Sequence, residues 1–94
     1  MGDIDPMVAI EKELQAERAS ALGEAGRKLE KMLAAFRENE SDDTRDELAT
    51  AVWHYLVLRE SLAMFDHNAA LAIYGVPDRV MARVGIYKRD PDLK

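Results

Sequence analysis

The sequence predicts an all-α fold, in which a long antiparallel helical hairpin is followed by two short C-terminal helices. Two observations carry this prediction. Apolar residues recur every three or four positions between residues 7 and 36, and no alternating pattern typical of strands is present. The segment 51–58 holds seven apolar or aromatic residues in eight positions, so both sides of a helix there require cover. We expect one domain, 1–94, with flexible ends at 1–5 and 86–94.

The first helix is predicted from about residue 6 to about residue 38. Asp5 suits the N-cap, and Pro6 suits the first helical position, because the N–H that proline lacks would be unpaired there. Arg18 is the one charged residue on the apolar stripe, which otherwise holds Met7, Ile10, Leu14, Leu22, Ala25, Leu29, Met32 and Phe36. An unbroken helix of this length extends about 50 Å.

A polar turn at 39–43 separates this helix from a second one. Thr44 and Glu47 have the spacing of a capping box, in which each side chain satisfies a free N–H at the start of a helix. Helical spacing of apolar residues then continues to about residue 65. The short turn predicts that the two helices are antiparallel neighbours.

Two short helices are predicted after a break at Asp66, His67 and Asn68. The first includes Ala69 to Tyr74 and ends at Gly75, and the second includes Pro77 to Val84 and ends at Gly85. Glycine is favoured just past a helix end because it adopts the left-handed backbone conformation without steric cost.

Small residues form one face of the first helix, at Ala19, Gly23 and Gly26. Glycine inside a helix costs about 1 kcal/mol relative to alanine, so we interpret this face as a position of close packing, with a kink as the alternative. If the hairpin turns near Ser41, the numbers of facing residues sum to about 82. That register places Leu29 against Trp53 and Arg59 beside Gly23.

The second helix covers the first only from about residue 17 onward, so Met7, Ile10 and Leu14 need another cover. The short helices or a second subunit are the two candidates. The broad apolar surface of 51–58 favours a second subunit, and we therefore predict a homodimeric helical bundle. Its expected interface or core anchors are Trp53, Tyr55, Leu56, Arg59 and Glu60, with Glu60 orienting Arg59.

Composition excludes several classes of function. The chain has no cysteine, which rules out disulfides and thiolate chemistry. Neither histidine has the spacing of a helical metal site, no phosphate loop or nucleophile elbow is present, and no apolar run is long enough to cross a membrane. We therefore expect a cytoplasmic protein that is not an enzyme and that needs no metal or cofactor.

Two alternative functions remain open. Residues 69–84 are similar to a helix-turn-helix in which Arg79 and Arg83 would face DNA, although a net charge of −5 disfavours nucleic acid as a partner. Arg18 and Arg59 lie on apolar stripes and would otherwise hold a small anionic ligand within the bundle. The simpler interpretation of these two arginines is a salt bridge with Glu17 or Glu60.

The chain also resembles an uncharacterised family of short helical bacterial proteins of unknown function. The resemblance rests on the segments 19–27 (ASALGEAGR), 51–55 (AVWHY), 59–60 (RE), 66–67 (DH), 74–77 (YGVP) and 82–85 (ARVG). It implies a helical fold and brings no catalytic residues.

The leading hypothesis for function is therefore a small interaction or scaffold protein that buries an apolar helix face against a second copy of itself, or against another protein.

Overall fold

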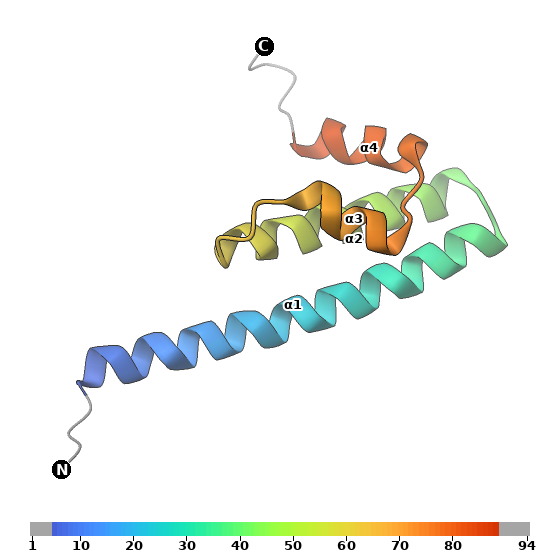
Figure 1. The fold of residues 1–94 in the computed structure, drawn as a ribbon. Coiled ribbons are helices and arrows are strands. Elements are labelled where there is room, and N and C mark those ends of the chain that lie inside the picture. Colours follow the sequence, from blue (N-terminus) through green and yellow to red (C-terminus); the bar gives the residue numbers. More distant parts are fainter. Residues whose placement is uncertain (1–4, 89–94) are drawn as a thin grey trace.

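The computed structural model describes residues 5–88, with side chains through Val84, and within that range it contains four helices and no strand. The helices are α1 (Pro6–Glu38), α2 (Asp42–Ser61), α3 (His67–Tyr74) and α4 (Asp78–Lys88). Helices α1 and α2 form an antiparallel hairpin, and α4 lies along the side of α2 away from α1 (Figure 1). The predicted all-α fold, with a long hairpin and two short C-terminal helices, is confirmed.

The core of the molecule is an apolar seam between the second half of α1 and α2. Leu29 of α1 and Leu48 and Val52 of α2 are completely buried in it. Their spacing places them once per turn on the inner face of each helix. The register is close to the predicted one, because Gly26 lies beside Tyr55, and their numbers sum to 81. Phe36 and Leu33 close the seam near the turn.

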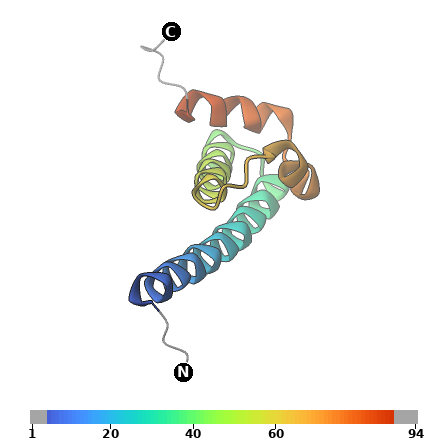
Figure 2. The same cartoon turned by 60° about the vertical axis from the view of Figure 1, so that its left-hand side comes forward.

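The two hairpin helices differ in length, and this difference gives the molecule its elongated shape. The 33 residues of α1 extend about 50 Å, whereas the 20 residues of α2 extend about 30 Å. All residues from Asp5 to Ser20 are exposed as a result. Figure 2 shows α1 projecting beyond the other three helices, and the overall extents are 59 × 34 × 21 Å.

The ends of α1 and α2 are set by local hydrogen bonds. Asp5 caps α1 as predicted, and its Oδ1 accepts from the Met7 amide at 3.0 Å. The capping box of α2 differs from the prediction, because it joins Ser41 and Thr44 instead of Thr44 and Glu47. Helix α2 begins at Asp42, so Thr44 occupies the third helical position and not the cap.

Helix α2 ends at Ser61 in a turn that the sequence did not signal. The amide of Ala63 donates to the Glu60 carbonyl at 3.0 Å and that of Met64 to the Arg59 carbonyl at 2.9 Å, which is the pattern of a Schellman motif. Ala63 has the left-handed backbone conformation that this motif requires, with φ of 60°. The helix therefore stops four residues before the predicted end.

Of the two predicted glycine stops, one is correct and one is wrong. Gly75 ends α3 in the left-handed conformation, with φ of 70°. Gly85 does not end α4, which continues to Lys88. Residues 86–88, expected in a flexible tail, are therefore helical, and Asp5 is an ordered cap. The rest of the two expected flexible ends, 1–4 and 89–94, lies outside the described residues.

Only one of the three small residues of α1 is a site of close packing. A Cβ atom on Gly26 would lie 2.8 Å from the Tyr74 hydroxyl and 3.5 Å from the Tyr55 ring. At Gly23 the corresponding contact is with Arg27 of the same helix at 3.5 Å, so Arg59 does not lie beside Gly23 as predicted. Ala19 is exposed. The small-residue face is therefore a single notch at Gly26, and α1 continues through it without a break.

The notch predicts opposite effects for two equivalent substitutions. Gly23→Ala should raise the free energy of unfolding by about 0.5–1 kcal/mol, because alanine is the better helix former and its Cβ finds room. Gly26→Ala should lower it by about 1 kcal/mol, because the new Cβ displaces Tyr74. Urea unfolding followed by circular dichroism measures both, and equal effects at the two positions would show that the notch is not closed by Tyr74.

The Schellman turn predicts a stabilising substitution. Ala63→Gly should raise the free energy of unfolding by about 1 kcal/mol, because glycine adopts the left-handed conformation without the steric cost that alanine bears. Ala72→Gly, at an exposed position inside α3, is the control and should be destabilising. The account of this turn is wrong if Ala63→Gly destabilises the protein as Ala72→Gly does.

Candidate protein-interaction surface

The projecting half of α1 carries large apolar side chains with no cover. Met7, Ile10 and Leu14 are 62%, 48% and 45% exposed. They lie on one side of the helix, since they are separated by three and four residues. Three such side chains on one face of a solvated helix are typical of a surface that is covered by another chain. Neither α3 nor α4 folds back over them, which removes one of the two covers considered from the sequence (Figure 1).

The same side of α1 continues into a groove between α1 and α2. Eighteen residues make about five turns of a helix, so Met32 lies directly along the axis from Leu14. Ala21 and Lys28, 7 and 14 residues after Leu14, fall within about 40° of the same line. We call the surface formed by Met7, Ile10, Leu14, Ala21 and Met32 the α1 stripe. It passes from a fully solvated region into a partly covered one.

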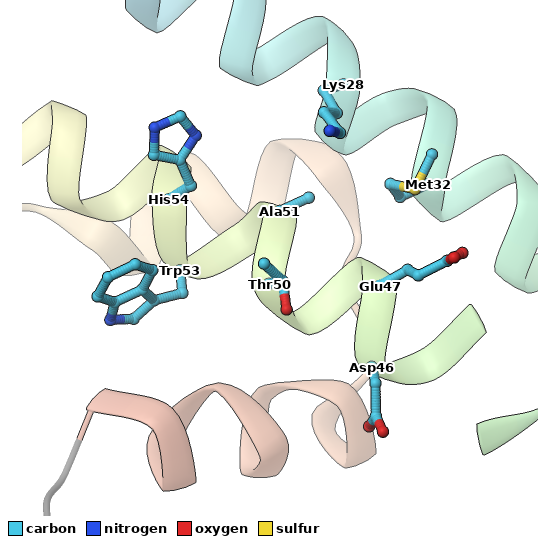
Figure 3. Close-up of a pocket in the computed structure, with 8 residues that line it drawn as sticks. All are labelled: Lys28, Met32, Asp46, Glu47, Thr50, Ala51, Trp53 and His54. Atoms are coloured by element: carbon cyan, nitrogen blue, oxygen red, sulfur yellow. The ribbon is translucent and has the colours of Figure 1, made fainter. Parts of the chain in front are cut away.

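The groove has a volume of about 690 Å³. Lys28 and Met32 of α1 form one wall, and α2 forms the other with Asp46, Glu47, Thr50, Ala51, Trp53 and His54 (Figure 3). In this view α3 lies behind α2, so the groove is on the face of the hairpin that α3 leaves open. Its walls combine apolar carbon with both signs of charge.

Trp53 lies at the edge of this groove and not in the core. Trp53 is 37% exposed, whereas Leu29 is completely buried. Trp53 is therefore not buried in the seam against Leu29, as the sequence predicted. Trp53 faces outward because of its angular position on α2. Tyr55 and Leu56, the next two predicted anchors, are buried in the seam, and successive residues of a helix are rotated by about 100°. Trp53 and the exposed Val57 therefore belong to the outer surface of the single chain.

The charged pair predicted among the anchors is arranged differently from the expectation. Arg59 is buried, and its Nη2 donates to the backbone carbonyl of Asp66 at 3.0 Å. The Glu60 Oε2 lies 2.9 Å from Nε2 of His67, so Glu60 holds the start of α3, while the Asp66 carbonyl orients Arg59. The sequence offered no signal for Asp66 in this role, because the acceptor is a backbone atom.

Arg18 and Arg59 do not form one ligand site. Arg18 is in the exposed half of α1, and Arg59 is buried at the end of α2, which packs on the other half. Arg18 also forms no ion pair with Glu17 or with any other acid in the range 5–88. It is an exposed cation beside the α1 stripe.

The two arginines of α4 that would contact DNA are paired with acids of the hairpin. Nη2 of Arg79 lies 2.6 Å from Oε1 of Glu40, and the same guanidinium is 5.1 Å from the centre of the Phe36 ring. Nε of Arg83 lies 3.2 Å from Oδ1 of Asp46. These contacts fasten α4 to the hairpin. They also place carboxylates where a phosphate backbone would have to approach, which disfavours the helix-turn-helix alternative.

Other kinds of site find no support in the described part of the chain. It contains no group of three or more histidine and acidic side chains placed to hold a metal ion. No helix between Pro6 and Lys88 combines the length and the hydrophobicity needed to cross a lipid bilayer. The surface features that remain are the α1 stripe with its groove, and a smaller cavity at Arg59.

Fold and surface together define a small all-α protein with one helix half left uncovered. The chain belongs to a family of unknown function, DUF6665, whose sequence profile matches residues 5–92. This match confirms the expected membership of an uncharacterised family. No curated protein and no solved structure matches the chain.

The contact between α2 and α4 predicts a dependence of stability on pH. Desolvation acts against the shift, but hydrogen bonds and attraction from Arg45 and Arg83 hold the pKa of Asp46 below its usual value of 3.8. The stability that Asp46 contributes is therefore present above about pH 4 and is lost as the pH falls through the lowered pKa. Asp46→Asn should melt at a lower temperature than the wild type at neutral pH, and the difference should shrink in acid.

Asp43→Asn is the matched control for this measurement, because Asp43 is exposed at the same end of α2 and forms no ion pair with any residue up to Val84. Melting curves at several pH values compare the three proteins. A difference between wild type and Asp46→Asn that stays constant down to about pH 2 would contradict the assignment.

Proposed function

We propose that this protein is a small, non-enzymatic interaction protein that acts as a homodimer, in which the α1 stripe of one copy packs against the α1 stripe of a second copy. The single observation that carries the proposal is the exposure of Met7, Ile10 and Leu14 on a helix half that no other described element covers. Burying the part of each side chain that is still exposed is worth about 1 kcal/mol, and a twofold dimer buries every one of them twice.

Charge favours an antiparallel arrangement of the two α1 helices. When a twofold axis passes beside Leu14, the two Leu14 side chains meet, and Met7 of each copy lies opposite Ala21 of the other. Glu11 then falls within about one residue of Arg18 of the second copy, on the same flank of the stripe. Neither residue has an ion-pair partner within the described chain, and the dimer gives each of them one.

A parallel arrangement removes this pairing. In a parallel pair with the stripes in register, Glu11 and Arg18 would lie on the opposite flank of the contact from the same two residues of the second copy. Glu11 would then not meet Arg18 of the second copy. The antiparallel pair also places the start of each α1 near the groove end of the other copy, where Val57 and Trp53 are exposed.

The scaffold would act in the cytoplasm, and a chain without cysteine is compatible with that reducing compartment. A bundle of two hairpins would leave both copies of α4 on its outer sides, available for a further protein partner. The DNA-binding alternative is weaker, because no observation beyond the presence of Arg79 and Arg83 supports it.

Sedimentation equilibrium tests the dimer. At high micromolar concentration the wild type should have twice the chain mass of 10.6 kDa. Leu14→Glu should raise the dimer dissociation constant at least about a hundredfold, because it places two carboxylates in the contact. Gln15→Glu is the control, since it makes the same change one position away from the stripe and should leave the dimer intact. A monomeric wild type at that concentration would refute the proposal.

Two further variant sets test the orientation. Glu11→Arg and Arg18→Glu should each weaken the dimer, and the double exchange should restore it. Because the chain has no cysteine, Met7→Cys and Ala21→Cys introduce unique thiols. Mixing the two single variants under oxidising conditions should give the mixed disulfide, whereas a dominant disulfide between two Met7→Cys chains would indicate the parallel arrangement.

A further inference from the structure

A second cavity of about 370 Å³ lies between α2 and α3. Its lining consists of Tyr55, Arg59, Asp66, Ala69, Ala70, Ile73 and Tyr74. The Asp66 carboxylate caps α3 by accepting from the Ala69 amide at 3.3 Å. Figures 1 and 2 show α3 alongside the hairpin. The cavity shares no lining residue with the groove of the α1 stripe. Its volume is within the range of small-molecule pockets.

Arg59 lines this cavity and has no counterion among the side chains of residues 5–84. The residue is 9% exposed, and its Nη2 donates to a neutral carbonyl, that of Asp66. Its Nε is buried and has no hydrogen-bond partner within the same range. A buried charge is costly unless it is paired. An anion in the cavity would supply the missing pair.

Two tyrosines line the same cavity. The rings of Tyr55 and Tyr74 meet edge to face with centres 5.4 Å apart. The Tyr74 hydroxyl lies in the notch at Gly26, where a side chain on α1 would displace it. Burial, helped by Tyr55 and Glu30, raises the pKa of Tyr74 to about 12, so this hydroxyl keeps its proton at neutral pH and remains a hydrogen-bond donor.

The apolar part of the lining narrows the class of ligand. Ala69, Ala70 and Ile73 come from one side of α3, and Ile73 is 83% exposed at the mouth. We infer that this cavity binds a small organic carboxylate. The carboxylate pairs with Arg59 and accepts from the Tyr74 hydroxyl, and a short hydrocarbon part lies against the alanines and Ile73. An inorganic anion would leave that wall without a partner. This site does not depend on the proposed dimer.

Titration of the ¹⁵N-labelled full chain with benzoate tests the site by amide chemical shifts. Benzoate should perturb amides around Arg59, Ala69 and Tyr74. Benzamide, which is neutral and has the same shape, and inorganic phosphate, which has no hydrocarbon part, should both bind at least about tenfold more weakly. Equal affinity for either control compound, shifts confined to the groove at Trp53, or no saturable shift would overturn the inference.

Four variants test which side chains hold benzoate. Arg59→Met keeps an apolar stem and removes the charged group, and should weaken benzoate binding by at least about tenfold, whereas Tyr74→Phe should weaken it roughly three- to tenfold. Arg27→Met, which removes an exposed arginine of α1, should bind as the wild type does. If Arg59→Met loses its helical signal, Ala69→Leu decides instead. This variant fills the cavity and leaves Arg59 in place, and undiminished binding would contradict the site.

Discussion

The structure depends on the apolar seam that joins the second half of α1 to α2. Leu29, Leu48 and Val52 are fully buried there, and the two remaining helices pack on this pair. Helix α4 buries Val80 and Val84 against it, while Tyr74 of α3 fits into the notch at Gly26. Because one helix is about 20 Å longer than the other, the same seam that folds the protein leaves half of α1 bare.

Helix α2 is the element that separates the two candidate sites. One of its faces carries Trp53 and forms the open groove next to α1, and a different face carries Arg59 beneath α3. A single helix of 20 residues therefore serves both the surface proposed for self-association and the cavity proposed for a carboxylate. Since the two lie on different faces, occupation of one does not obstruct the other.

Much of this fold could be predicted from the sequence, because the apolar period determines which helix faces are buried. The extent of α1, its cap at Asp5 and the stop at Gly75 all follow from local rules. The end of α2 could not be found, since its left-handed residue is Ala63, which carries no such signal. At Gly85 the prediction failed in the opposite way, because a helix end was predicted there and α4 continues to Lys88. A glycine favours a helix end but does not require one.

The surroundings of the candidate site residues could be predicted less well than the fold, for a related reason. The run 51–58 is apolar on every side, so its composition could not show that Trp53 faces solvent while Tyr55 faces the seam. The environment of Arg59 depends on a backbone carbonyl and on a tyrosine fifteen residues away. Such contacts arise from tertiary packing and have no sequence period. By contrast, the need of Met7, Ile10 and Leu14 for a cover was evident from helix lengths alone.

Amide hydrogen exchange as a function of protein concentration tests this account most directly. Amides of 25–36 and 48–59 should be protected at every concentration, because the seam forms within one chain. Amides of 9–18 should exchange rapidly in dilute solution and become protected as the concentration rises through the dimer dissociation constant. Protection of 9–18 that does not change with concentration, whether high or absent throughout, would contradict the claim that a second copy covers the uncovered half of α1.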